Sequence, residues 1–509
     1  MKLRWLLTWA VPVALLTAAT PVLAEPAARF TSDTFRYSSQ EERHYGRAAL
    51  EQLGILGLGS VWYFSNRDAN SVDWDLNYDW PSFRQKLDGR AYAFDTNHFE
   101  TNFLSHPTAG TLYYLAARGN RLSPLVSLSY AVGSSTLWEF VGEFRERVSV
   151  NDMMVTPLSG FVLGEALTQL GGFFDRSCDT SGTRVLGSVF GPSKSFHDAL
   201  DGAVLDRTNS CDAHGFSRIG SHRFGFSLGP RAVWQLKGRT QPFMEMAEEL
   251  NLAVENLSAL GLPGRGFRSF SDGNIAELSA KIAGGSFGWS DFFLAAKVVP
   301  VGIHYRDIPW LGEHGESGRE AIFGLLLGAE YSSHAYARGV AAADKMFVLD
   351  APAVRLSYRV HPRGKGLVFT LDGGSSFAGV SAFAIDAYER TATLDTLPTI
   401  AEARGYNYSV GAHLGPSIRL EGKDLDLSVT ARADRFWALK VLDRVREAPG
   451  EFMIVEGRRD ISARLDFHPA RFPISLFATA DARNRFGSIG EVRVSRAEVA
   501  LGAGLGGRL

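Results

Sequence analysis

Residues 424–434, DLDLSVTARAD, alternate strictly between polar and apolar side chains. Successive side chains of a β-strand point to opposite faces, so this segment has one apolar and one charged face. The alternation recurs in residues 460–468 and 474–483. Segments of roughly ten residues with this pattern are typical of transmembrane β-barrels, in which one face contacts lipid and the other lines a polar interior.

The pattern covers the C-terminal part of the chain, from about residue 216 onward. About twelve such segments can be counted. They begin near residues 222, 243, 275, 291, 319, 350, 366, 404, 424, 451, 472 and 491. A soluble sandwich also alternates and remains an alternative, since the C-terminus VALGAGLGGRL lacks a terminal Phe or Trp.

The late connections support a barrel. Those at 361–364, 421–423 and 468–470 are short, and those at 383–403 and 440–450 are long. Outer-membrane barrels have short periplasmic turns and longer outer loops. The 53 glycines and 34 phenylalanines of the 509-residue chain also suit an antiparallel β architecture. A net charge of -2 gives no reason to expect a nucleic-acid partner.

The first 24 residues have the pattern of a signal peptide. Lys2 and Arg4 precede an apolar run over residues 6–16, and residues 22–24, VLA, form a small-residue cleavage site. An uncleaved anchor helix is the alternative, which the shortness of the apolar run disfavours. We therefore expect a bacterial protein that is exported to the outer membrane.

The apolar pattern of residues 98–174 is helical, unlike that of the C-terminal part, and it predicts three apolar helices. Each has a proline at the first helical position, where the backbone N–H that proline lacks would have no partner within the helix. These prolines are at positions 107, 124 and 157. Gly119 is expected to end the first helix, and Gly171 and Gly172 the third.

Six titratable residues lie in or beside these apolar helices. They are His98, His106, Glu139, Glu143, Asp152 and Glu165. Because buried charge needs a partner, we expect them to form one polar cluster, whose catalytic role stays open. Glu139 and Glu143 share a helix face and could hold a divalent metal with a histidine. Pairing of Glu143 with Arg147 and of Glu139 with Arg118 is simpler, so no metal and no cofactor are expected. Glu165 should pair with Arg118 or a histidine.

Three motifs in this region resemble those of a known family. They are HPxxGxxYYxxAR at 106–118, SxxWEFxxE at 135–143 and NDxxxTPxxGxxxGE at 151–165. They resemble the bacterial envelope proteins of the domain-of-unknown-function 3943 family, over about residues 80–180. That family has no established activity, so the resemblance implies an envelope setting and no mechanism.

Cys178 and Cys211 are the two cysteines, and they lie in a connector rich in Gly, Ser and Asp. In an exported protein they are expected to form a disulfide, with two free thiols as the alternative.

The sequence thus predicts an α+β protein with a helical domain followed by an antiparallel transmembrane barrel. The expected units are a signal peptide (1–24), a lead-in segment (25–79), the helical domain (80–175), the connector (176–215) and the barrel (216–509). The helical domain is expected to plug the barrel or to cap its periplasmic mouth.

Three classes of function remain open. A non-enzymatic channel or envelope-structure protein is favoured, since no G-x-S-x-G elbow, P-loop or dinucleotide fingerprint occurs. The alternatives are a lipid- or glycan-modifying enzyme that uses the Glu/His cluster, and a scaffold that binds a periplasmic protein. Outer-membrane lipid is the expected partner in all three classes.

Overall fold

The computed structural model of the chain describes residues 31–33, 42–65, 75–205, 207–236, 242–285, 288–309, 317–336, 343–362, 366–390, 400–439, 453–469 and 474–508. The expected signal peptide (1–24) and the expected outer loop at 440–450 lie outside these residues.

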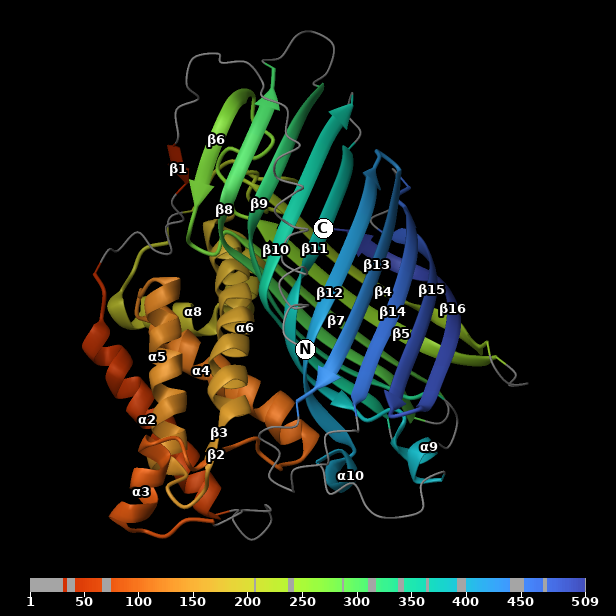
Figure 1. Cartoon of the computed structure of the whole chain (residues 1–509). Helices are drawn as coiled ribbons and strands as arrows, with labels where there is room; N and C mark the ends of the chain where they lie inside the picture. The colour runs from red at the N-terminus through yellow and green to blue at the C-terminus, as the bar shows by residue number, and fades with distance from the viewer. Residues whose placement is uncertain are drawn as a thin grey trace, which may run out of the picture.

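Twelve antiparallel strands form a closed β-barrel in the C-terminal part of the chain (Figure 1). They are β4 (Ser221–Gln235), β5 (Phe243–Glu255), β7 (Ile275–Gly285), β8 (Gly288–Ile308), β9 (Ser317–His334), β10 (Asp344–Pro362), β11 (Gly366–Ser381), β12 (Tyr406–Glu421), β13 (Leu425–Ala438), β14 (Ile454–Phe467), β15 (Ser475–Ile489) and β16 (Val492–Arg508). β16 pairs with β4, and β8 pairs with both β7 and β9, which closes the ring. The predicted fold class and strand number are confirmed.

A further strand that the alternation did not predict extends the wall at one rim. β6 (Gly264–Phe270) pairs with the C-terminal part of β8, which is 21 residues long, and β1 (Thr31–Asp33) adds to β6 in parallel. β6 has the sequence GRGFRSF. Its seven residues include two glycines, so it carries too few alternating positions to be recognised.

The two faces of the wall differ as the alternation predicts. On β13, Ser428, Thr430 and Arg432 line a cavity of 670 Å³ inside the barrel. Leu427 and Val429, on either side of Ser428, point outward and are exposed. The wall therefore has an apolar outside and a polar inside.

Strand direction alternates around the ring, so successive connections lie at opposite rims, and each rim carries both short and long connections, the tight β15–β16 turn among those at the rim of the long β13–β14 connection. The short turns β10–β11 and β12–β13 share one rim, here called the short-turn rim, with the start of β4 and the end of β16. The opposite, long-loop rim carries the β13–β14 connection and the β11–β12 connection with helices α9 (Ile385–Glu389) and α10 (Ile400–Arg404).

The N-terminal part is a bundle of helices. They are α2 (Tyr45–Ser65), α3 (Trp80–Leu87), the π-helix η1 (Thr101–Ser105), α4 (His106–Gly119), α5 (Pro124–Leu137), the π-helix η2 (Trp138–Gly142), α6 (Val150–Arg176), α7 (Ser181–Phe190) and α8 (Pro192–Asp201). The short strands β2 (Tyr92–Ala93) and β3 (Val148–Ser149) pair in parallel. By hydropathy and length, none of the described helices qualifies as a membrane span.

The predicted end of the first helix and the predicted start of the second are confirmed, whereas the first helix begins before its proline because η1 runs directly into α4. α4 ends at Gly119, and the Ser123 hydroxyl accepts a hydrogen bond from Val126 N at the start of α5. α6 differs, because it begins at Val150 with Ser149 as its N-cap and runs through Pro157 to Arg176. Ser149 caps the helix before the proline is reached, so the proline does not mark its start.

Gly171 does not end α6 either. A Cβ at this position would lie 2.5 Å from the Cα of Gly191, where α7 meets α8. The glycine permits close packing of two segments inside the helical region. The expected connector therefore contains two helices that pack on α6.

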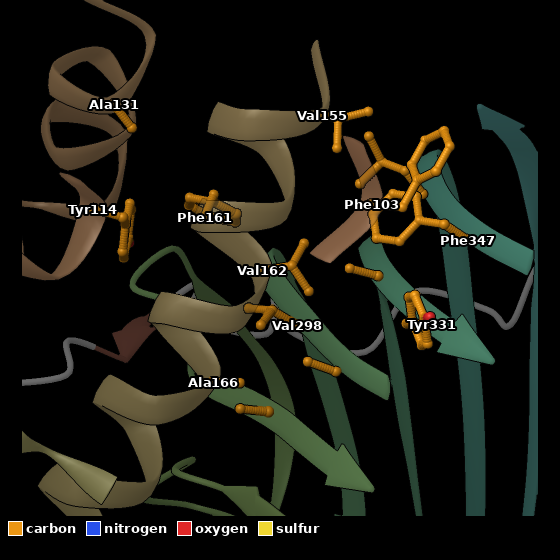
Figure 2. Packing of buried hydrophobic residues seen from close by; sticks show 14 of the residues in the cluster. Phe103, Tyr114, Ala131, Val155, Phe161, Val162, Ala166, Val298, Tyr331 and Phe347 are labelled. Carbon is orange, nitrogen blue, oxygen red and sulfur yellow. The ribbon is translucent and has the colours of Figure 1, made fainter. Parts of the chain in front are cut away.

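The helical region lies against the outer face of the barrel wall (Figure 1). Phe103 of η1 stacks on Phe347 of β10, and Val162 of α6 packs near Val298 of β8 (Figure 2). Val298 follows Lys297, whose side chain lines the cavity on the inner face. Within the described part of the chain, that cavity is lined by residues between 223 and 507 and by none of the helical region.

The expectation that the helical domain plugs the barrel or caps its mouth is therefore wrong. Its contacts extend along the wall from Phe224, at the start of β4, to Tyr406, at the start of β12, and these strand ends lie at opposite rims. Alternation cannot reveal this placement, because an apolar outward side chain is equally suited to lipid and to an apolar helix.

The predicted disulfide is confirmed. Cys178 and Cys211 are bonded, with their Cα atoms 6.1 Å apart. The bond ties the segment that follows α6 to the segment that precedes β4, and so holds the helical region close to the first strand of the barrel.

Candidate functional site

The six predicted site residues fall into three places. His106, Glu139, Glu143 and Asp152 come together at one end of the bundle. His98 is exposed on the turn before η1, and Glu165 lies in the middle of α6. The structure therefore brings four of the six residues together and places His98 and Glu165 elsewhere.

Glu165 pairs with Arg118, as expected. The Nε and Nη2 atoms of Arg118 donate to the two carboxylate oxygens at 2.8 and 2.9 Å, and both side chains are buried. Tyr114 and Gln169 donate to the same carboxylate at 2.5 and 2.6 Å. The predicted pair between Arg118 and Glu139 is therefore wrong.

The remaining four residues belong to a larger group that also contains Asp95 and Glu146. We call the six residues Asp95, His106, Glu139, Glu143, Glu146 and Asp152 the acidic cluster. The parallel pairing of β2 with β3 sets Ala93 opposite Ser149. Because Asp95 lies two residues after Ala93 and Asp152 three after Ser149, this pairing brings the two carboxylates together.

Asparagine side chains orient the carboxylates of the acidic cluster. Asn151 Nδ2 donates to Asp152 Oδ1 at 2.8 Å, and Asn151 Oδ1 accepts from the backbone N–H of Asp95 at 2.8 Å. Asn97 Nδ2 donates to Asp95 Oδ2 at 2.5 Å. Glu139 is fixed by the backbone N–H of Ser149, which donates to its Oε2 at 2.7 Å.

One imidazole faces two of the carboxylates. His106 Nε2 lies 3.7 Å from Asp152 Oδ1. One ligand atom each from Asp95, His106 and Asp152 lies within 4.8 Å of the others. Oxygen and imidazole nitrogen atoms in such a set are suited to a divalent metal ion.

The cluster is electrostatically unfavourable when it is fully ionised. Glu139, Glu143 and Asp152 are buried close to one another and to further carboxylates, so their negative charges repel one another. The cluster therefore favours a state with fewer negative charges, reached by protonation or by cation binding.

The arginine expected to neutralise Glu143 lies elsewhere. Arg147 pairs with Asp75 at 3.0 Å, so the predicted Glu143–Arg147 pair is wrong. In the part of the chain that the structure describes, no Lys or Arg forms an ion pair with Asp95, Glu139, Glu143 or Asp152. Lys86 is buried beside them and donates to the backbone oxygens of Glu139 and Glu143.

The three motifs, now placed around one buried cluster, also match a family model. Residues 91–192 match the family model described as a domain of unknown function, DUF3943, and this segment is called the DUF3943 domain below. The predicted resemblance is confirmed. All six residues of the acidic cluster lie within the DUF3943 domain, as do Arg118 and Glu165. No curated protein matches the chain.

Solved structures similar to the barrel are outer-membrane proteins. OmpT of Vibrio cholerae is 7% identical, with 58% of this chain and 99% of that chain covered, at a TM-score of 0.21. The channel DcaP of Acinetobacter baumannii is 10% identical, with 57% and 98% covered, at a TM-score of 0.19. A FadL homologue of Pseudomonas aeruginosa is 9% identical, with 57% and 90% covered, at 0.20. Scores this low carry no functional argument.

Proposed function

We propose that this protein is an exported outer-membrane protein whose closed barrel serves as a support for the DUF3943 domain. In this proposal the domain is held in the lipid beside the barrel, and the barrel does not act as an open channel. The single observation that carries the proposal is the uncharged outer surface of residues 45–65 and 101–142, which form α2, α4, α5 and the two π-helices.

The exposed side chains of the helices are apolar or small over a long stretch. In residues 45–65 and 101–142, all of which are described, no Asp, Glu, Lys or Arg is exposed. On α2 the most exposed of the large apolar side chains are Leu50 at 70% and Leu58 at 74%. An apolar surface of this extent is unfavourable in water and favourable in lipid.

The length of α2 matches the thickness of a membrane. Its 21 residues, at about 1.5 Å each, span about 31 Å, close to the roughly 30 Å hydrocarbon core of a bilayer. Charged groups gather at its two ends. Arg47 pairs with Asp201 near the start of α2, and Tyr63 near its end donates to Glu146 of the acidic cluster.

The apolar surface continues onto the barrel. Outward residues of the wall beyond the contacts of the helical region, such as Phe226, Leu414 and Ile461, are about half exposed. Those under the helices, such as Phe347 and Tyr406, are buried by the domain. One apolar surface therefore runs around the helices and the free part of the wall, and lipid acyl chains are the occupant that suits all of it.

Spin labels test the position of the helices. In full-length protein reconstituted into liposomes, nitroxides at Leu53, Leu58 or Val132 should collide readily with oxygen and rarely with a water-soluble nickel chelate. A label at Arg184, on the exposed surface of α7, is the control and should show the reverse preference. Nickel accessibility at Leu58 equal to that at Arg184 would reject the lipid-embedded arrangement.

The lumen is bridged by ion pairs between strands on nearly opposite sides. Arg458 of β14 pairs with Glu330 of β9, and Arg485 of β15 with Asp344 of β10. Each pair joins strands that are five positions apart in the ring of twelve. The β11–β12 connection also enters the bore, where Phe383 lies under the Arg485 guanidinium at 4.8 Å. These contacts support a bore that is closed toward the long-loop rim.

Conductance tests the closed bore. The purified protein should conduct little in planar bilayers, and replacing both Glu330 and Arg458 by glutamine should raise single-channel conductance several-fold. Replacing Arg184 by glutamine, which breaks an exposed pair with Asp179, should change nothing. A large and steady conductance of the unmodified protein would show that the bore is open.

A further inference from the structure

The geometry points to a divalent transition-metal site in the DUF3943 domain, with Asp95, His106 and Asp152 as ligands. This inference goes beyond the proposed supporting role of the barrel, and it differs from the sequence-based expectation that the protein holds no metal.

The three residues converge from separate parts of the domain. Asp95 follows β2, His106 begins α4, and Asp152 lies in the first turn of α6. Their ligand atoms lie within 4.8 Å of one another. Bonds of roughly 2.0–2.2 Å to one ion need a closer approach of the three side chains.

A second observation, which does not depend on how many acidic residues lie here, indicates that Asp152 binds a cation. The Oδ2 atom of Asp152 is buried and accepts no hydrogen bond from any residue that the structure describes. The residue as a whole is 1% exposed. An unsatisfied carboxylate oxygen in such a place is costly, and a bound cation would supply the partner it lacks.

The groups around the three ligands are arranged as in metal sites. Asn97 and Asn151 hold the ligand carboxylates of Asp95 and Asp152 in place through their amides. Such outer partners orient metal ligands and typically change metal affinity by about 10–100-fold when they are removed. Glu139 and Glu143 add negative charge close to the site.

The donor set narrows the choice of metal. It consists of carboxylate oxygens and one imidazole nitrogen, with no thiolate, because both cysteines are in the disulfide. Carboxylates favour Mn²⁺ and imidazole favours Zn²⁺ and Fe²⁺, whereas soft ions prefer sulfur. His106 is also the most accessible of the three ligands, since its side chain is 17% exposed against 2% for Asp152.

Manganese binding tests the site in the full-length protein. Detergent-purified protein, stripped with EDTA and dialysed, is titrated with Mn²⁺ and followed by the loss of the free-ion EPR signal. One ion per chain should bind, Zn²⁺ should displace it, and Asp152→Asn and His106→Gln should each weaken binding at least ten-fold. Asp88→Asn is the matched control, because Asp88 is an exposed acid near the same end of the bundle that pairs with Arg90.

Folding is checked separately, so that a lost site is not confused with a lost domain. Circular dichroism and the heat-dependent gel mobility of each variant should equal those of the unmodified protein. If the folded, unmodified protein binds neither Mn²⁺ nor Zn²⁺, the inference is overturned. The negative charge of the cluster would then be reduced by protonation alone. Equal affinity in the folded Asp152→Asn variant would overturn it as well. The spin-label result is independent of both outcomes.

Discussion

Replacing Gly160 with leucine is expected to unfold the DUF3943 domain and to leave the barrel closed. A Cβ at Gly160 would lie 2.3 Å from the carbonyl carbon of Gly110, and a Cβ at Gly110 would lie 1.8 Å from the carbonyl oxygen of Thr156. These are backbone atoms of α4 and α6, so no side-chain rotation relieves the clash. The two helices must separate, at an expected cost of more than about 4 kcal/mol.

Gly133 provides the matched control for this substitution. It is also a helical glycine of the DUF3943 domain, but a Cβ at this position would have no neighbouring atom within 4 Å among the described residues. Gly133→Leu should therefore leave the domain resistant to protease, whereas Gly160→Leu should make residues 91–192 sensitive. In both variants the barrel should keep its heat-dependent gel mobility. Equal protease resistance of the two variants would contradict the close contact of α4 with α6.

The barrel could be predicted because each of its strands carries its own signal. The segments predicted near 243, 275, 366 and 424 begin within one residue of β5, β7, β11 and β13. Alternation over ten or more residues is unambiguous when one face is apolar and the other charged. The placement of the helical domain has no such signal. The residues that it covers, such as Phe347, are apolar like those that would face lipid.

The acidic cluster could be predicted only in part, for a related reason. Glu139 and Glu143 stand out because they interrupt apolar helices, whereas Asp95 lies in a segment with no periodicity. Asp95 reaches the cluster through the two-residue pairing of β2 with β3, which is too short to leave a pattern in the sequence. Glu146 lies in the equally irregular segment between η2 and β3. The motif NDxxxTP, in which Asn151 precedes Asp152, is the one sequence signal that a neighbouring side chain holds a carboxylate of the cluster in place.

Replacing Arg118 with alanine should destabilise the DUF3943 domain by about 3–5 kcal/mol, because it leaves Glu165 buried without its cation. The pair lies where three parts of the molecule meet. Arg118 is on α4, Glu165 is on α6, and Gln169, which donates to Glu165, also donates to the backbone oxygen of Asp272 between β6 and β7. Loss of the ion pair should therefore also loosen the contact of the domain with the barrel. The change in stability is measured by chemical unfolding followed by circular dichroism.

The double variant Arg118→Met with Glu165→Leu separates the cost of an unpaired charge from the cost of lost packing. Both replacements are apolar and fill most of the space of the original side chains, so no ion remains to be buried. Such replacements of buried pairs are often neutral or stabilising. The double variant should thus regain most of the stability that Arg118→Ala loses, whereas Arg184→Ala, at an exposed pair, should cost about 0–1 kcal/mol. If the double variant is as unstable as the single one, the hydrogen bonds of Tyr114 and Gln169 to Glu165 contribute more to the domain than the ion pair does.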